Sequence, residues 1–136
     1  MKFLFLCVLL IGLFPTSKVS LTVNVTGFTD NVGKSYIALY RPKDTWPEIN
    51  KQFIGKVVAI SGKTSSVKFE YLECGMYAVA VFHDRNNNGK LDKNMLGIPV
   101  ERYGFSNNAR ETFSAPSFSS ASVELQKDRA ISIYVK

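Results

Sequence analysis

The sequence has few of the residues on which disulfide-stapled folds and acid–base catalysis depend. It contains two cysteines and one histidine in 136 residues. Cys7 lies in an apolar N-terminal stretch, so Cys74 is the only cysteine in the rest of the chain. A single cysteine cannot form an internal disulfide, which argues against a small disulfide scaffold. His83 is the only histidine, and general acid–base catalysis relies on histidine more often than on any other side chain.

The sequence also lacks an apolar run long enough to cross a membrane. The run at residues 3–14 is much shorter than the roughly 20 residues that a spanning helix needs. Lys2 precedes it and polar residues follow, an arrangement typical of a secretory signal peptide. We therefore expect a signal peptide over residues 1–20, no transmembrane segment after processing, and a secreted, periplasmic or outer-envelope protein. The alternative is a buried N-terminal helix or a retained anchor.

Positive charge is in excess but is not concentrated. Lys and Arg number 17 against 11 Asp and Glu, which gives a formal net charge of +6. Subtracting Lys2 and Lys18, two charges, leaves +4. The remaining basic residues are scattered, with no basic stripe carrying interleaved aromatic residues. We therefore expect no nucleic-acid partner.

Helical periodicity is absent, and alternation with a period of two replaces it. Val23 and Val25, for example, alternate with polar neighbours. The run at residues 76–83 is apolar on both faces, as in a central strand covered on both sides. Turn signals separate the segments, which favours an all-β fold, a β-sandwich in a single domain over residues 21–136. The predicted strands are seven: residues 21–25, 34–40, 53–60, 66–72, 76–83, 122–125 and 130–134.

Residues 84–121 show no clear strand or helix pattern. A loop of this length is uncommon in a compact domain and is usually functional or disordered. Its apolar content argues for order, and we expect it to fold over the outer face of the strand at residues 76–83. The apolar residues are Met95, Leu96, Ile98, Tyr103, Phe105, Phe113 and Phe118.

The head of this loop has the ligand spacing of a calcium site. Oxygen-bearing side chains stand at its first, third, fifth and ninth positions, with glycine at the sixth, as in the first nine residues of an EF-hand loop. The backbone carbonyl at the seventh position would add a further ligand. The predicted ligands are Asp84, Asn86, Asn88, Lys90 (through its carbonyl) and Asp92.

The loop also departs from an EF-hand. Met95 stands at the twelfth position, where an EF-hand has a bidentate glutamate, and no flanking helices are predicted. Glu101 or Glu111 would have to fold back to supply that carboxylate, and we expect weak, millimolar to submillimolar binding. The alternative is an Asn-Gly turn in which Asp84 and the asparagines bond their own backbone.

The same region carries a resemblance to a known family. The residues that carry it are 75–84, Asn86, 88–92, 97–99, Glu101, 103–108 and 116–118. On these residues the chain resembles the bacterial family catalogued as domain of unknown function 2141, over essentially the whole predicted mature chain. The resemblance implies a secreted or envelope-associated bacterial protein with no established activity. The glycine, tyrosine and valine of residues 75–79 are also similar to prealbumin-like domains, so we expect an antiparallel sandwich of immunoglobulin-like or prealbumin-like type.

Three functional hypotheses follow. The first is a non-catalytic binding or interaction module for an unknown envelope or extracellular ligand, with calcium at residues 84–92 and the long loop as its functional surface. The second is a small hydrolase of envelope polymers, with Asp84 and Glu101 as paired carboxylates. Cys74 and His83 would lie roughly 30 Å apart on an extended strand, too far to act as nucleophile and base. The third is a purely structural envelope protein.

Overall fold

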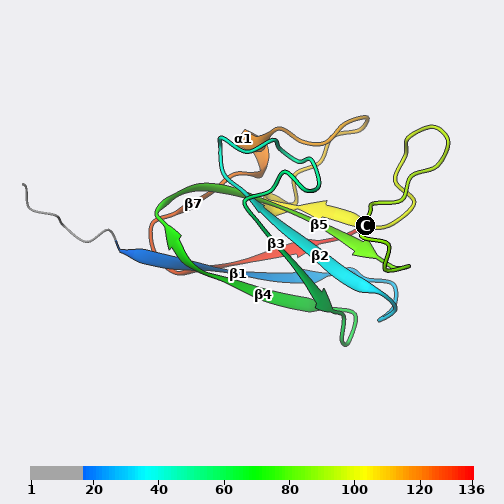
Figure 1. Ribbon diagram of the computed structural model, residues 1–136, viewed down its shortest axis with the longest axis horizontal. Helices are drawn as coiled ribbons and strands as arrows, with labels where there is room; N and C mark the ends of the chain where they lie inside the picture. The colour runs from blue at the N-terminus through cyan, green and yellow to red at the C-terminus, as the bar shows by residue number, and fades with distance from the viewer. Residues whose placement is uncertain (1–16) are drawn as a thin grey trace, which may run out of the picture.

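The computed structural model describes residues 17–136, which form a two-layer β-sandwich (Figure 1). The predicted signal peptide lies outside the described residues up to residue 16. Among residues 17–136, no helix is both long and apolar enough to cross a membrane. In chain order the elements are β1 (Lys18–Thr26), β2 (Lys34–Tyr40), β3 (Ile54–Ala59), β4 (Ser65–Glu73), β5 (Gly75–Asp84), β6 (Tyr103–Phe105), a 3-10 turn (Ser106–Asn108), α1 (Phe118–Ala121), β7 (Val123–Leu125) and β8 (Arg129–Tyr134).

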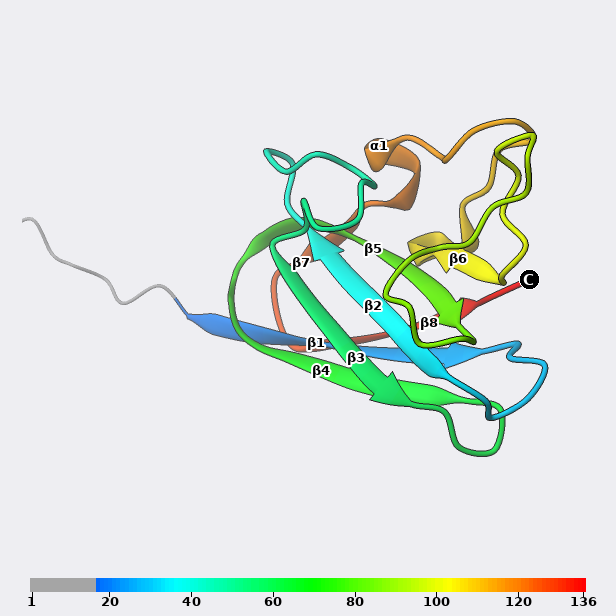
Figure 2. The ribbon, with the colours of Figure 1, turned by 45° about the vertical axis from the view of Figure 1, so that its right-hand side comes forward.

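The strands form two sheets that pack face to face and cross at an angle (Figure 2). The first sheet has the order β4-β1-β8. The second has the order β3-β2-β5-β6, and β7 pairs with the start of β5. The predicted all-β sandwich is confirmed. The pairing is mostly antiparallel, as expected, except that β1 and β8 run parallel, from Leu21 opposite Arg129 to Thr26 opposite Tyr134.

Each of the seven predicted strands corresponds to an observed one, and the structure adds an eighth. The strand β6 was missed because three residues with a central glycine show no alternation to count. Gly104 is required there by close approach, since a Cβ atom would lie 2.7 Å from the carbonyl oxygen of Tyr134. In this way β6 lies against the end of β8 and links the two sheets.

The main core lies between the two sheets. It is built from the inward faces of β1 and β4 on one side and of β2 and β5 on the other, which explains the alternation seen in the sequence. Residues of this core that are fully buried include Leu21, Val23, Val25, Ile37, Leu39, Val79, Leu125 and Ile133.

The outer face of β5 is covered only in part. At its first half, Ala78 packs in a small cluster with Phe105 and Ala121, against which Trp46 and Phe118 also pack. The prediction that the long loop folds over this strand holds there, and Phe82, farther along the same face, is also buried. The prediction was wrong for four of the apolar residues that were expected to pack down, because Met95, Leu96, Ile98 and Phe113 are exposed.

Candidate functional site

The outer face of the second sheet carries a row of aromatic side chains. Strand register places Tyr36 of β2 opposite Phe82 of β5, and Phe82 opposite Tyr103 of β6. The rings of Tyr36 and Phe82 are stacked, with centroids 4.9 Å apart and planes inclined by 16°. Because cross-strand neighbours share one face of a sheet, these rings form a continuous aromatic surface.

The next row across the same strands is small. Ala38 of β2 lies opposite Ala80 of β5, and Ala80 lies opposite Phe105 of β6. Two methyl groups between large aromatic side chains leave a hollow in the outer face of the sheet. Beyond it stands Trp46, whose ring centroid is 5.6 Å from that of Phe105 and 5.1 Å from that of Tyr40.

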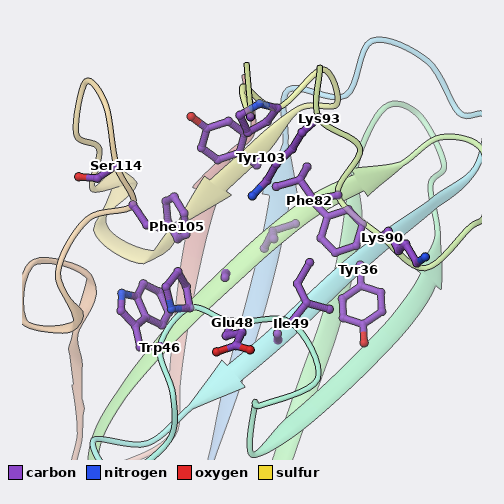
Figure 3. Close-up of a pocket in the computed structure, with 18 of the residues that line it drawn as sticks. Tyr36, Trp46, Glu48, Ile49, Phe82, Lys90, Lys93, Tyr103, Phe105 and Ser114 are labelled. Carbon is purple, nitrogen blue, oxygen red and sulfur yellow. The ribbon is translucent and has the colours of Figure 1, made fainter. Parts of the chain in front are cut away.

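Loops raise walls around this hollow and turn it into a groove of about 1080 Å³. One wall comes from residues 46–50, which precede β3, and the others from residues 89–91, 93, 96–99 and 111–115 of the long loop. Figure 3 shows Trp46 and Phe105 at one end of the groove and Phe82 and Tyr36 at the other.

The walls are held in place by specific contacts. The indole N–H of Trp46 donates to the carbonyl oxygen of Pro116 at 2.8 Å, so the first wall is bonded to the long loop. The hydroxyl of Tyr40 donates to the carbonyl oxygens of Pro47 and Glu48 at 3.1 and 2.8 Å. Burial raises the pKa of Tyr40 well above its usual range, so this hydroxyl keeps its proton.

The lining is mostly apolar, with four charged residues: Glu48, Lys90, Lys93 and Glu111. In Figure 3, Lys93 reaches toward the sheet beside Tyr103, and Lys90 lies at the Tyr36 end. Neither lysine forms an ion pair with any residue from 17 to 136. The groove therefore combines an aromatic floor with two lysines and two glutamates, none of which forms an ion pair with any residue from 17 to 136.

The predicted calcium loop begins where β5 ends. Asp84 is buried, and its carboxylate accepts the backbone N–H groups of Asn88 at 3.1 Å and Gly89 at 2.8 Å. Asn87 and Gly89 have φ of 57° and 73°, which brings the chain back over Asp84. Such left-handed residues are common in turns built from Asn and Gly.

Asp92 closes the loop from the other side. Its carboxylate accepts the side-chain amide N–H of Asn86 at 2.6 Å and of Asn88 at 2.7 Å. The hydrogen bond from Asn88, reinforced by that from Asn86, holds the pKa of Asp92 below its usual range. The backbone N–H of Lys90 donates to the side-chain oxygen of Asn88 at 3.0 Å.

Glu101 folds back onto this loop. One carboxylate oxygen accepts the backbone N–H of Arg85 and the other that of Asp92, both at 3.1 Å. Glu111, the alternative considered from the sequence, lines the groove instead. The structure thus brings together Asp84, Asn86, Asn88, Asp92 and Glu101, with Lys90 on the same turn.

The residue types fit a hard cation, but their hydrogen bonds satisfy them without one. Each of the three carboxylates accepts two N–H groups and retains further lone pairs. Over residues 17–136, no group of three or more His, Cys, Asp or Glu side chains is arranged to hold a metal. Asn86 and Asn88 would have to turn over their amides, so that oxygen replaces N–H, before they could serve as ligands.

The other chemically reactive side chains lie apart from the groove. His83 is buried, its Nε2 atom lies 2.6 Å from the carbonyl oxygen of Val32, and its ring packs edge-on against Phe28. Cys74 is exposed, just before β5, whereas His83 is near the far end of that strand. The two do not meet, as their separation in the sequence predicted.

The floor of the groove was not recognised from the sequence, although a signal was present. Alternation within residues 34–40 places Tyr36, Ala38 and Tyr40 on the face opposite to the core residues Ile37 and Leu39. An outer face that mixes aromatic and small residues, without charges, indicates a surface that something covers.

Comparison with known proteins shows which family the chain matches. A sequence model of DUF2141, described as an uncharacterised protein conserved in bacteria, matches residues 23–133, from the middle of β1 into β8. No curated protein and no solved structure matches the chain.

Proposed function

This chain belongs to the DUF2141 family, and we propose that it is an exported, non-catalytic binding module whose site is the aromatic groove. The observation that carries the proposal is the hollow over Ala38 and Ala80, floored by strands and walled by loops. Small-molecule sites are concave, mostly apolar, and of a few hundred to about 1,000 Å³. The groove has that character.

The chemistry of the lining defines the class of ligand. A flat or aliphatic group fits over the two alanines, between the rings of Phe82 and Trp46. Lys93 and Lys90 have no carboxylate partner among residues 17–136, so an anionic group on the ligand would pair with them. The proposed ligand is therefore an apolar molecule with one anionic group.

The hydrogen bonds accepted by the carboxylates of Asp84 and Glu101 favour a binding function over a hydrolytic one. A glycoside hydrolase needs two carboxyl groups free to act on substrate. Asp84 and Glu101, the pair considered for that role, accept backbone N–H groups within their own loop. Glu48 and Glu111 remain in the groove, but neither a histidine nor a cysteine accompanies them in the lining.

Calcium enters this proposal as a stabiliser of one wall. Asp84, Asn86, Asn88, Asp92 and Glu101, with the carbonyl of Lys90, would hold it. The loop they form leads directly into the part of the wall that carries Lys90, Leu91 and Lys93. A bound cation would replace the N–H groups that now satisfy Asp92 and would fix this wall.

A binding measurement tests the groove directly, because Trp46 is the only tryptophan and lines it. The probe is 1-anilinonaphthalene-8-sulfonate, an apolar aromatic anion that accepts energy from tryptophan. We expect saturable quenching of Trp46. Ala80→Leu, which fills the hollow, should weaken binding about tenfold or more. Ala59→Leu, the same change at an exposed site on β3, serves as the control.

Two results would contradict the proposal. One is the absence of saturable quenching in the unmutated protein. The other is an equal affinity in the protein with Ala80→Leu and in the control, since dye bound elsewhere on the surface would not sense the filled hollow. Circular dichroism of both variants checks that the sandwich is retained.

A further inference from the structure

The mouth of the groove is surrounded by exposed apolar side chains. Leu96 is 82% exposed and Phe113 99% exposed, and both also line the groove. Met95 is fully exposed and lies outside the lining. Contiguous apolar surface that is left in water marks a site of interaction with a partner or a membrane.

The exposure of Met95 and Leu96 is fixed by a tight turn. The side-chain oxygen of Asn94 accepts the backbone N–H groups of Leu96 at 2.9 Å and Ile98 at 3.1 Å. The backbone N–H of Asn94 donates to the carbonyl of Ile98 at 2.9 Å, and Gly97 has a φ of 75°. The turn thus presents both side chains outward in a defined geometry.

Charged residues of both signs lie beside this turn. Lys90 and Lys93 are exposed and form no ion pair within residues 17–136. The neighbouring carboxylates of Asp92 and Glu101 accept N–H donors of their own loop and keep their negative charge. Glu48 and Glu111 also line the groove, and Glu111 lies on the segment that carries Phe113. The apolar tips are the side chains of Met95, Leu96 and Phe113. The two lysines precede the first two tips in the sequence, and Glu111 lies near the third.

We propose that this mouth docks on an anionic lipid surface. The side chains of Met95, Leu96 and Phe113 enter the boundary between headgroups and acyl chains, and Lys90 and Lys93 pair with headgroup phosphates. Docking goes beyond ligand binding in the groove. It depends on the side chains of Met95, Leu96 and Phe113 and not on the hollow over the two alanines of the sheet. It places the groove directly above the lipid, where an apolar anion is found at high local concentration.

Sedimentation with vesicles tests the docking. The full mature chain should sediment with vesicles of mixed phosphatidylglycerol and phosphatidylcholine, and much less with phosphatidylcholine alone. Lys90→Gln and Lys93→Gln should each weaken binding to the anionic vesicles about fivefold. Adding salt should weaken it further, because surface attraction is screened.

Two tip variants separate docking from the groove. Met95→Ser should weaken vesicle binding about tenfold while dye binding in the groove is unchanged, since Met95 is not in the lining. Leu96→Ser should also weaken docking. The matched control is Tyr71→Ser, because Tyr71 is 81% exposed but lies on β4 in the other sheet.

The outcomes are distinguishable. Failure to sediment with either vesicle overturns the docking proposal and leaves dye binding in the groove untouched. Equal loss of binding in the Met95→Ser and Tyr71→Ser proteins overturns it too, because the tips would then have no special role. Loss of dye binding with vesicle binding retained would instead count against the groove.

Discussion

The carboxylate of Glu101 accepts the backbone N–H of Asp92 at 3.1 Å, although nine residues separate them. Its other oxygen accepts the backbone N–H of Arg85 at the same distance. One side chain thus spans the start and the end of the turn at residues 85–92. The turn forms one wall of the groove, so its stability bears on the proposed binding site.

Glu101→Ala should lower the free energy of unfolding by about 1 kcal/mol, because water replaces two hydrogen bonds to a charged acceptor at a half-exposed site. For a domain of this size the melting temperature should fall by roughly 4 °C. Glu101→Gln should cost less, since one acceptor oxygen remains. Glu111→Ala is the control. An unchanged melting temperature in the Glu101→Ala protein would show that the two hydrogen bonds accepted by Glu101 do not stabilise the fold.

Calcium at ten times its Kd should stabilise the protein by about 1.4 kcal/mol if only the folded state binds it. That corresponds to a rise of roughly 4 °C in scanning fluorimetry. Magnesium should give a smaller rise, because it demands a tight octahedral shell and releases water reluctantly. Asp84→Asn should abolish the increment, whereas Glu111→Gln should keep it. Identical melting curves in calcium and in chelator would leave residues 84–92 as a hydrogen-bonded turn.

Asp92 should make the protein less stable in acid. Its pKa is lowered in the folded state by hydrogen bonds from Asn88 and Asn86, so its contribution is present above the unfolded value of about 3.9. That contribution is lost as pH falls through the lower folded value. Urea midpoints measured between pH 6 and the acid limit should therefore fall less steeply for Asp92→Asn. A parallel pH profile in that variant would contradict this assignment.

Secreted material should begin at or before Lys18, which is earlier than the start at residue 21 expected from the sequence. The strand β1 starts there, Val19 is buried opposite Leu72, and the ammonium of Lys18 pairs with Glu73 at 3.2 Å. Removal of residues through Ser20 would cut into the core strand. Intact-mass measurement locates the start, and a protein that retains Met1 would count against export by a cleaved signal.

The sequence was sufficient to predict the strands in which apolar and polar residues alternate. Burial of one face of a sheet imposes this period of two, and it can be counted along the chain. The sequence was insufficient for β6, where Gly104 is fixed by contact with a strand thirty residues away in the sequence. The parallel pairing of β1 with β8 is equally invisible locally, since register between distant strands leaves no mark in either segment.

The candidate loop was predicted better than the groove. The spacing of Asp84, Asn88 and Asp92 reflects local turn chemistry, and the structure does bring these side chains together. Glu101 was one of two candidates, and only tertiary contact could choose between them. The groove depends on Ala38, Ala80 and Trp46, which come from three separate segments, so its hollow arises only after the sheet has formed.

The parallel pairing of β1 with β8 also constrains when the small sheet can form during folding. The middle strand of the small sheet is the first one made, and one of its two neighbours is the last. The polypeptide therefore cannot finish this sheet until β8 is available. Such pairing of distant segments is typical of slow folders, because a long loop must close first. In a nascent chain, β1 therefore lacks one of its two neighbours until β8 has been synthesised.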